Sequence, residues 1–261
     1  MAFLELNYYS KALQTHTTVN ILLPEKSKSE KETGIISDEG YKTIYLLHGR
    51  NGNHTDWMRQ TSIERYAAQY NVAVVMPGVG RSWYSDTAYG AKYFTFVTKE
   101  LPEFCRSCFK GMSDKREDNI VAGLSMGGYG AIKAAMSCPE VFGYCASLSG
   151  ALDITRKGLY SRMDEWKAFF DFNMESELEL EGTKNDIYAL TRKNHEEGVP
   201  FPKLYLWCGT EDALLKNNRD YRDLLEELKI DHRYEEGEGD HTWKWWDLHI
   251  QDALKYLLGD E

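Results

Sequence analysis

Short apolar runs alternate along this chain with longer segments in which apolar residues recur every three or four positions. Eight runs have the composition of strands: LNYYSKAL, TTVNILLP, TIYLLHG, VAVVMPG, NIVAGLS, YCASLSG, KLYLWCG and HRYEEGEG. Several intervening segments have helical spacing, among them WMRQTSIERYAAQY, YFTFVTKELPEFCRSCF, GYGAIKAAMSC and YRDLLEELK. This alternation predicts a mostly parallel eight-stranded sheet with helices on both faces, because parallel strands need long crossovers. The first two runs predict an antiparallel hairpin at one edge, since no helix separates them.

Two long stretches interrupt this alternation of predicted strands and helices. Residues 25–42 (EKSKSEKETGIISDEGYK) are charged and unperiodic, and we expect an exposed, mobile loop there. Residues 153–200 separate the sixth and seventh runs by far more than an ordinary connection. A lid or cap over a site is one interpretation of this insertion, and a surface excursion is the other. At 261 residues the chain is expected to form one domain, 1–261.

The charge, the apolar runs and the cysteines of the chain limit the partners and the compartment that we expect for it. The chain has 31 Lys and Arg against 41 Asp and Glu, a formal net charge of -10, so its surface field repels nucleic acid and anionic membranes. The segment MAFLELNYYSKALQ lacks the pattern of a secretion signal, and no apolar run approaches the ~20 residues that cross a bilayer. The 5 cysteines, an odd number, indicate reduced thiols. We therefore expect a cytoplasmic protein with no nucleic-acid or membrane partner.

The segment Cys105-Arg-Ser-Cys108 has the spacing of a redox motif or of half a zinc site. A second ligand pair at metal spacing is missing from the sequence, and the surrounding FVTKELPEFCRSCF is typical of a helix. We interpret the two thiols as packed helix residues. The sequence thus predicts no metal and no cofactor.

The segment NIVAGLSMGGYGAIKAA contains a strand, a tight turn and a helix in the order of a nucleophile elbow. Ser125 lies in the turn, and Gly123 and Gly127 stand two positions away on either side, where the strained turn favours residues without Cβ. The helix that follows directs its N-terminal N–H groups and its positive end toward the serine. The glycines match neither the dinucleotide pattern nor a P-loop, so we predict that Ser125 is a nucleophile.

A serine nucleophile needs a base to accept its proton and a carboxylate to orient that base. Glu211 and Asp212 follow the run KLYLWCG, and His241 follows the next run. This is the order of serine, acid and histidine expected at the carboxyl ends of parallel strands. We predict Asp212 as the acid and His241 as the base, with Glu211 as the rival acid and Asp240 as a loop or helix-cap residue.

The third apolar run ends in His48-Gly49-Arg50, at the position where such an elbow is met by a second backbone donor for an oxyanion. The predicted oxyanion donors are the N–H groups of Arg50 and Met126. Gly49 is expected beside the substrate, and His48 is expected to order the loop.

Aromatic residues and the remaining histidines offer further candidates. Trp83 and Tyr84 follow the fourth run at the same sheet edge, where contact with an acyl or alcohol group and packing under the loop are equal alternatives. The last helix carries a stripe at spacings of three and four, which indicates a core: Trp243, Trp246, Ile250, Leu254 and Leu257. The other histidines are interpreted as structural or surface residues: His16, His195, His232 and His249.

The motifs YLLHGRNGNHTDW, GRSWYSDTAYG, AGLSMGGYGA, LWCGTED and GDHTWKWW resemble the esterase D and tributyrin esterase family of α/β-hydrolases, which is similar to feruloyl and acetyl esterases. The resemblance covers nearly the whole chain, least at 25–42 and 153–200. It implies that Ser125 is the nucleophile, Asp212 the acid and His241 the base, with Arg50 and Met126 as oxyanion donors. The loop LLHGRNGN departs from the Ser-Gly-Leu-Thr-Cys loop of S-formylglutathione hydrolases, which favours a small carboxylic ester over a glutathione thioester.

Residues and resemblance together predict an α/β-hydrolase that acts as a serine carboxylesterase on short-chain acyl esters, including acetylated or feruloylated sugars. The alternatives are an S-formylglutathione hydrolase, an acyltransferase and a non-catalytic binding module on the same fold. The expected partner is a small-molecule ester, and homo-oligomer formation stays open.

Overall fold

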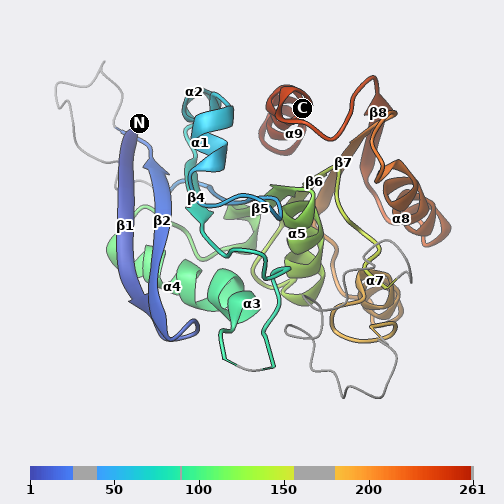
Figure 1. The fold of residues 1–261 in the computed structure, drawn as a ribbon, viewed down its shortest axis with the longest axis horizontal. Coiled ribbons are helices and arrows are strands. Elements are labelled where there is room, and N and C mark those ends of the chain that lie inside the picture. Colours follow the sequence, from blue (N-terminus) through green and yellow to red (C-terminus); the bar gives the residue numbers. More distant parts are fainter. Residues whose placement is uncertain (26–39, 89, 156–179, 260–261) are drawn as a thin grey trace.

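One eight-stranded sheet forms the centre of the computed structural model, which describes residues 1–25, 40–88, 90–155 and 180–259 (Figure 1). The strands are β1 (Ala2–Ser10), β2 (Thr15–Leu23), β3 (Thr43–Leu47), β4 (Ala73–Pro77), β5 (Asn119–Leu124), β6 (Tyr144–Leu148), β7 (Lys203–Gly209) and β8 (Arg233–Gly237). The β1–β2 and β2–β4 pairs are antiparallel, and every other neighbouring pair is parallel. The predicted sheet and its edge hairpin are confirmed.

The strand order, β1-β2-β4-β3-β5-β6-β7-β8, places β3 between β4 and β5. The chain therefore crosses from β3 to β4 in one direction and then passes back over β3 to reach β5. Ligands of open parallel sheets bind outside the carboxyl ends of the strands where the direction of winding changes. The carboxyl ends of β3 and β5 are thus the expected place for a site.

Helices cover both faces of the sheet, as the sequence predicts. One face carries α1 (Asp56–Gln60), α2 (Ile63–Gln69) and α9 (Trp243–Leu258). The other carries α3 (Tyr93–Thr95), the π-helical turn η1 (Phe96–Glu100), α4 (Leu101–Cys108), α5 (Met126–Ser137), α7 (Ile187–Glu196) and α8 (Leu215–Glu227). A short 3-10 turn, η2 (Arg116–Asp118), precedes β5. None of the described helices is long and apolar enough to span a bilayer.

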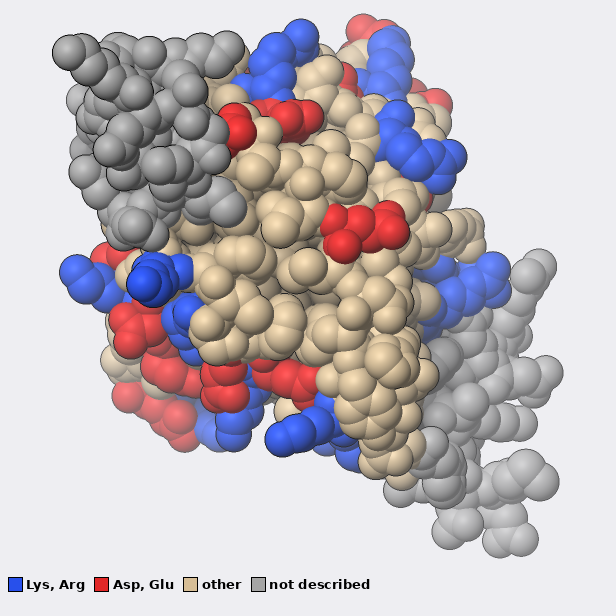
Figure 2. All heavy atoms as spheres, turned by 90° about the vertical axis from the view of Figure 1, so that its left-hand side faces the viewer, with Lys and Arg blue, Asp and Glu red and all other residues tan. Residues whose placement is uncertain are grey.

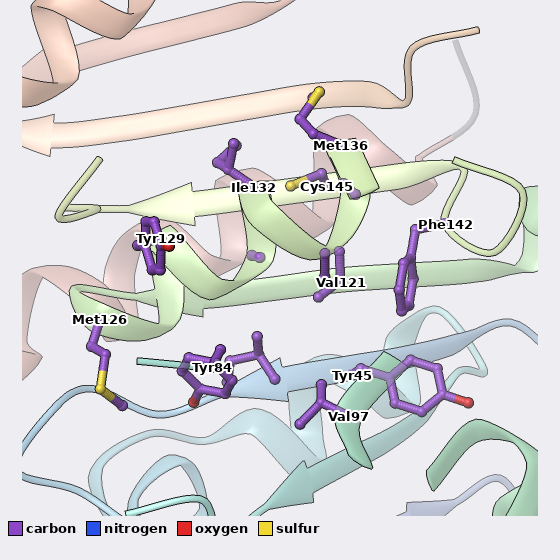
Figure 3. Packing of buried hydrophobic residues seen from close by; sticks show 14 of the residues in the cluster. Tyr45, Tyr84, Val97, Val121, Met126, Tyr129, Ile132, Met136, Phe142 and Cys145 are labelled. Atoms are coloured by element: carbon purple, nitrogen blue, oxygen red, sulfur yellow. The ribbon is translucent and has the colours of Figure 1, made fainter. Parts of the chain in front are cut away.

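The central strands are buried on both faces, which explains why they read as continuous apolar runs rather than as alternating patterns. Every residue of β3, β4 and β5 is buried. Figure 3 shows Tyr45 on β3, Val121 on β5 and Cys145 on β6 facing the helix layer that contains α5. Each large apolar side chain buried in this way contributes about 1.5–3 kcal/mol to stability.

The edge strand β1 alternates between inward and outward residues. Leu4, Leu6 and Tyr8 pack inward, and Tyr8 stacks on Phe104 of α4 with ring centroids 4.0 Å apart. The intervening residues point to solvent, among them Phe3 and Tyr9, which are 50% and 56% exposed. Figure 2 shows this side of the molecule, where uncharged residues form a broad central area with charged residues around it.

Part of the long insertion belongs to the ordinary helix layer. Within 153–200, α7 packs on α5, and the Asp186 side chain caps α7 by accepting hydrogen bonds from the N–H groups of Tyr188 and Ala189. The prediction of a lid therefore concerns the other part of the insertion, of which 156–179 lie outside the described residues. Most of the predicted loop 25–42 lies outside them too.

The C-x-x-C pair lies at the end of α4, in the helix that its spacing predicts. Cys105 is buried in the core and Cys108 is exposed. Burial raises the pKa of the Cys105 thiol to about 12, so this thiol stays protonated and unreactive at neutral pH. The interpretation as a packed helix residue is confirmed for Cys105 and wrong for Cys108, which lies on the exposed side of the helix end.

Candidate active site

Ser125 occupies a strained turn between β5 and α5. Its backbone has φ 54° and ψ −119°, a left-handed conformation that residues with a Cβ rarely adopt. A Cβ on Gly123 would collide with the backbone of Gly127 and lie 2.9 Å from the Leu47 Cβ. A Cβ on Gly127 would in turn lie 2.7 Å from the His48 carbonyl oxygen. Both flanking glycines are therefore sterically required, as the elbow pattern predicts.

We expect Gly123→Ala to destabilise the protein by roughly 2–4 kcal/mol, because the added methyl meets backbone atoms that cannot move independently of the sheet. Urea unfolding measures this loss as a lower midpoint. Gly237→Ala is the matched control, because a Cβ at this strand residue meets no atom within 4 Å. Equal midpoints for the two variants would contradict the steric account of the elbow.

The three predicted residues of the catalytic triad lie in one hydrogen-bonded line. The Ser125 hydroxyl lies 3.0 Å from His241 Nε2, and His241 Nδ1 lies 2.8 Å from Asp212 Oδ2. Since a carboxylate only accepts hydrogen bonds, the proton of a neutral His241 lies on Nδ1 and leaves Nε2 to accept the serine proton. The arrangement can deprotonate Ser125 as its oxygen attacks an electrophile.

The Asp212 carboxylate is fully buried yet well supplied with donors. Burial alone would raise its pKa, but hydrogen bonds from His241, from the Leu214 N–H and from the Ser149 hydroxyl hold the pKa below its usual value. The carboxylate is therefore ionised at neutral pH and can stabilise an imidazolium on His241. Trp246 supports the same group, because its indole N–H donates to Ser149 over 3.1 Å and its ring packs edge-on against His241.

Sequence reasoning did not single out Ser149. It directly follows β6, at the carboxyl edge that carries Ser125 and Asp212, and its φ of 48° marks a second strained residue there. A polar residue directly after a buried parallel strand is the signal that could have found it.

Glu211, the alternative candidate for the acid, bonds to a loop backbone, whereas His241 bonds to Asp212. The Glu211 carboxylate accepts a hydrogen bond from the Gly239 N–H over 2.6 Å, which ties the loop after β7 to the loop that carries His241. Asp240 accepts a hydrogen bond from the Thr242 hydroxyl, as a loop residue does. The geometry thus favours Asp212 over Glu211.

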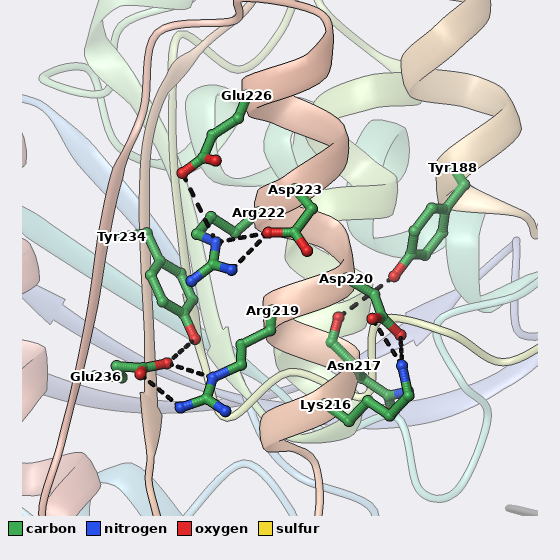
Figure 4. Close-up of polar contacts among 10 residues, drawn as sticks. All are labelled: Tyr188, Lys216, Asn217, Arg219, Asp220, Arg222, Asp223, Glu226, Tyr234 and Glu236. Carbon is green, nitrogen blue, oxygen red and sulfur yellow. Dashed lines mark hydrogen bonds and ion pairs between the residues drawn. The ribbon is translucent and has the colours of Figure 1, made fainter.

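The strand before His241 is held by polar contacts with α8 (Figure 4). Arg219 donates to both oxygens of Glu236 on β8, at 2.9 and 2.7 Å, and Tyr234 donates to the same carboxylate. The hydrogen bonds from Arg219 lower the pKa of Glu236 to about 2, so the pair stays charged at any physiological pH. These contacts fix β8, the edge strand from which the His241 loop starts.

The loop after β3 is ordered by His48, as predicted. The Val79 N–H donates to His48 Nε2 over 3.1 Å, so the ring proton lies on Nδ1 and points to the Gly49 carbonyl 2.7 Å away. Burial lowers the pKa of His48, which keeps the ring neutral. The Tyr84 hydroxyl adds a hydrogen bond to the His48 carbonyl over 2.9 Å.

A hollow of about 350 Å³ joins this loop to the triad. Its lining includes Gly49, Arg50, Asn51, Gly52 and Asp56 from the first loop and helix, Leu124 and Ser125 from the elbow, and His241, Thr242, Trp243 and Trp246. Met126 begins α5 beside Ser125, so its N–H has no acceptor within the helix. The residues predicted to surround an oxyanion therefore lie together.

The first turn of α9 is part of the site as well as of the core. Trp243 and Trp246 line the hollow, whereas Ile250, Leu254 and Leu257 are buried between the helix and the sheet. The predicted core stripe is confirmed, and its first two members also line the hollow, which the sequence does not predict.

The structure favours packing under the loop over substrate contact for Tyr84. This residue is 1% exposed, its hydroxyl bonds the His48 carbonyl, and it is not in the lining of the described hollow. Trp83 is 2% exposed and packs edge-on against Tyr129, so packing describes its ring too. The histidines that the sequence assigns to structural or surface roles do not line the hollow: His16, His195, His232 and His249.

Comparison with known proteins identifies the family of the chain. A family model, Esterase, described as "Putative esterase", matches residues 10–257. An acetyl esterase from Caldicellulosiruptor saccharolyticus is 36% identical over 267 residues, covering 98% of both chains. Two solved Staphylococcus aureus structures are 33% identical: the fluorophosphonate-binding serine hydrolase FphF (TM-score 0.84, 99% of each chain) and the S-formylglutathione hydrolase FrmB (TM-score 0.82, 98% of each chain). The chain therefore belongs to this esterase family, has the α/β-hydrolase fold and is a carboxylic ester hydrolase.

Proposed function

We propose that the protein is a serine esterase of short-chain carboxylic esters that works through an acyl-enzyme. Ser125 attacks the ester carbonyl while His241 accepts its proton, and the oxyanion is held by the N–H groups of Arg50 and Met126. His241 then donates the proton to the leaving alcohol. Water, deprotonated by the same histidine, attacks the acyl-enzyme, and the carboxylic acid leaves as Ser125 regains its proton.

One observation carries this proposal: the hydrogen-bonded line from Ser125 through His241 to Asp212 begins in a strained elbow at the surface of the hollow. A relaxed turn would connect β5 to α5 at a lower cost in free energy. The strain at Ser125, together with an aligned base and a buried, ionised acid, therefore points to a catalytic role. The similarity to FphF, a fluorophosphonate-binding serine hydrolase, supports the same assignment.

The hollow favours a small acyl ester with a polar alcohol. At about 350 Å³ it lies near the lower limit for ligand pockets, and Trp243 and Trp246 are among the residues that line it. Asn51, Asp56 and Thr242 line it as well and offer hydrogen-bonding groups to hydroxyls of an alcohol such as a sugar. The acetyl esterase relative supports an acetyl ester among the substrates.

Initial rates on p-nitrophenyl esters from acetyl to octanoyl, together with methyl ferulate, test this substrate range. We expect kcat/KM to be highest for acetyl to butyryl esters and to fall by about tenfold or more for octanoyl, because a long chain exceeds the hollow. Trp243→Ala should reduce this preference, because it replaces a large lining residue with a small one, while Leu248→Ala, on the exposed side of α9, should leave it unchanged. A flat profile in the wild type would contradict a small acyl site.

A thioester is the second candidate, favoured by the full-length similarity to an S-formylglutathione hydrolase. The same triad can attack a thioester carbonyl, so only the leaving group distinguishes the two. The ratio of kcat/KM on S-formylglutathione to that on p-nitrophenyl acetate separates them. We expect the oxygen ester to be preferred, and a large excess for the thioester would replace this part of the proposal.

A further inference from the structure

A fully buried lysine lies two turns beyond Ser125 on α5. Lys133 is 2% exposed, and its Nζ donates to Ser85 Oγ and Asn185 Oδ1 over 2.7 Å each and to the Tyr84 carbonyl over 3.2 Å. An ammonium has three N–H donors, so these three acceptors satisfy its charged form. A neutral amine has two, and one of the contacts would be lost.

Two aromatic rings also favour the cation, whereas none of the described carboxylates forms an ion pair with it. Nζ lies 5.1 Å from the ring centroid of Phe94 and 5.7 Å from that of Tyr129. Burial lowers the pKa of Lys133 to about 7, the charge of Asp86 opposes this shift and that of Lys184 adds to it. Burying a lysine that no carboxylate of the described residues contacts is unfavourable, which points to a role other than stability.

Hydrogen bonds through Tyr84 connect Lys133 to the His48-Gly49-Arg50 loop, which is proposed to supply one oxyanion donor. Tyr84 has φ 46°, a strained backbone conformation, and its carbonyl is one of the three acceptors of Lys133. Its ring packs on α5 at Gly130, where a Cβ would overlap the ring, and Figure 3 shows it beside this helix. Its hydroxyl donates to the His48 carbonyl, and His48 in turn donates to the Gly49 carbonyl. Two hydrogen bonds thus separate the lysine from the backbone that leads to Arg50.

We propose that Lys133 is a positioning residue for the oxyanion hole: its ammonium fixes Tyr84, and Tyr84 fixes the His48-Gly49-Arg50 loop in register with the N–H of Met126. Both proposed oxyanion donors are thereby tied to one helix, since Met126 begins α5 and Lys133 lies on it. This inference rests on the proposed function. It adds a buried group, remote from the substrate, on which transition-state stabilisation depends.

The sequence carries a weak signal for this residue. Every residue of α5 except Ser137 is buried, so a lysine in the segment GAIKAAMSC stands where no side chain reaches solvent. A single cation in a helix that is otherwise apolar on all sides requires internal acceptors. The acceptors themselves, from segments far away in the sequence, could not be predicted.

Four variants test the proposal: Lys133→Met, which keeps length and removes the charge, Tyr84→Phe, which removes one hydroxyl, their double variant, and Lys42→Met as control. Lys42 is half-buried, donates to the Tyr144 hydroxyl over 3.1 Å and lies over its ring, but does not line the hollow. The readouts are kcat and KM on p-nitrophenyl acetate and the inhibition constant of a short alkyl trifluoromethyl ketone, whose serine adduct carries an oxyanion. Titration with a fluorophosphonate gives the folded, reactive fraction for each variant.

We expect Lys133→Met to lower kcat by about 10- to 100-fold with KM changed less than about twofold, because a misplaced donor affects the transition state more than the bound ester. The inhibition constant should rise by the same factor as kcat/KM falls. Tyr84→Phe should act in the same direction, and the double variant should be no worse than Lys133→Met, since both act through one chain. Lys42→Met should retain the wild-type kcat.

Three results would overturn the inference: unchanged kcat in Lys133→Met, a change in KM alone, or fully additive losses in the double variant. Should Lys133→Met fail to fold, Tyr84→Phe decides alone, because an unchanged kcat and inhibition constant there remove the proposed connection. Failure of the proposed function is distinct, since it would appear as full activity in Ser125→Ala.

Discussion

Replacing Ser125 with alanine is expected to lower kcat on p-nitrophenyl acetate by about 10⁴- to 10⁶-fold, the largest effect of any single substitution in this chain. The reason is chemical: the hydroxyl 3.0 Å from His241 Nε2 is the proposed nucleophile, and no described side chain in the hollow can replace it. The elbow itself should persist, because the replacement keeps the Cβ and removes only the oxygen.

Ser137→Ala is the control for this experiment. Ser137 ends the same helix at a distance from the hollow, so its variant should keep the wild-type kcat. Active-site titration with a fluorophosphonate should give no reactive fraction in Ser125→Ala and a full one in Ser137→Ala. Comparable rates in the two variants would mean that another group attacks the ester.

Asp212→Asn has the second largest expected effect, a loss of about 10³- to 10⁴-fold in kcat. The amide has nearly the shape of the carboxylate, but it can present an N–H to His241 Nδ1 and so favour the wrong tautomer. It also removes the charge that stabilises the imidazolium. Steady-state kinetics on p-nitrophenyl acetate measures the loss.

Glu211→Gln provides the matched comparison at the neighbouring residue. Its amide oxygen can still accept the hydrogen bond from Gly239, so we expect a kcat within about threefold of the wild type. The contrast separates the acid of the triad from the carboxylate that ties two loops. A larger loss for Glu211→Gln than for Asp212→Asn would reverse the assignment.

Much of the fold could be predicted because the strands are short, apolar and separated by helical segments. Their order could not. β4 lies between β2 and β3, and this placement depends on which edges pair in three dimensions, a property that no local pattern records. Similarly, the long connection after β6 predicts an insertion that includes the residues of α7, although this helix packs on α5 in the ordinary helix layer.

The site shows the same division between local and tertiary information. Ser125 with its two glycines is a local motif. Asp212 and His241 reach it because all three residues lie at the carboxyl ends of parallel strands, in the turn or loop that follows each strand. Tyr84 is in the predicted loop, but its inward orientation follows from a strained backbone and from Gly130, to which the loop sequence gives no clue. Ser149 and Lys133 have only weak signals in the sequence, and their hydrogen-bond partners lie in distant segments that the structure alone brings together.

The most direct test of the account is to locate the covalent adduct of a fluorophosphonate by proteolysis and mass spectrometry. The account predicts modification at Ser125 in the wild type and strongly reduced modification in His241→Ala, because the hydroxyl needs its base. An adduct on a different residue, or equal labelling without His241, would contradict the proposed triad.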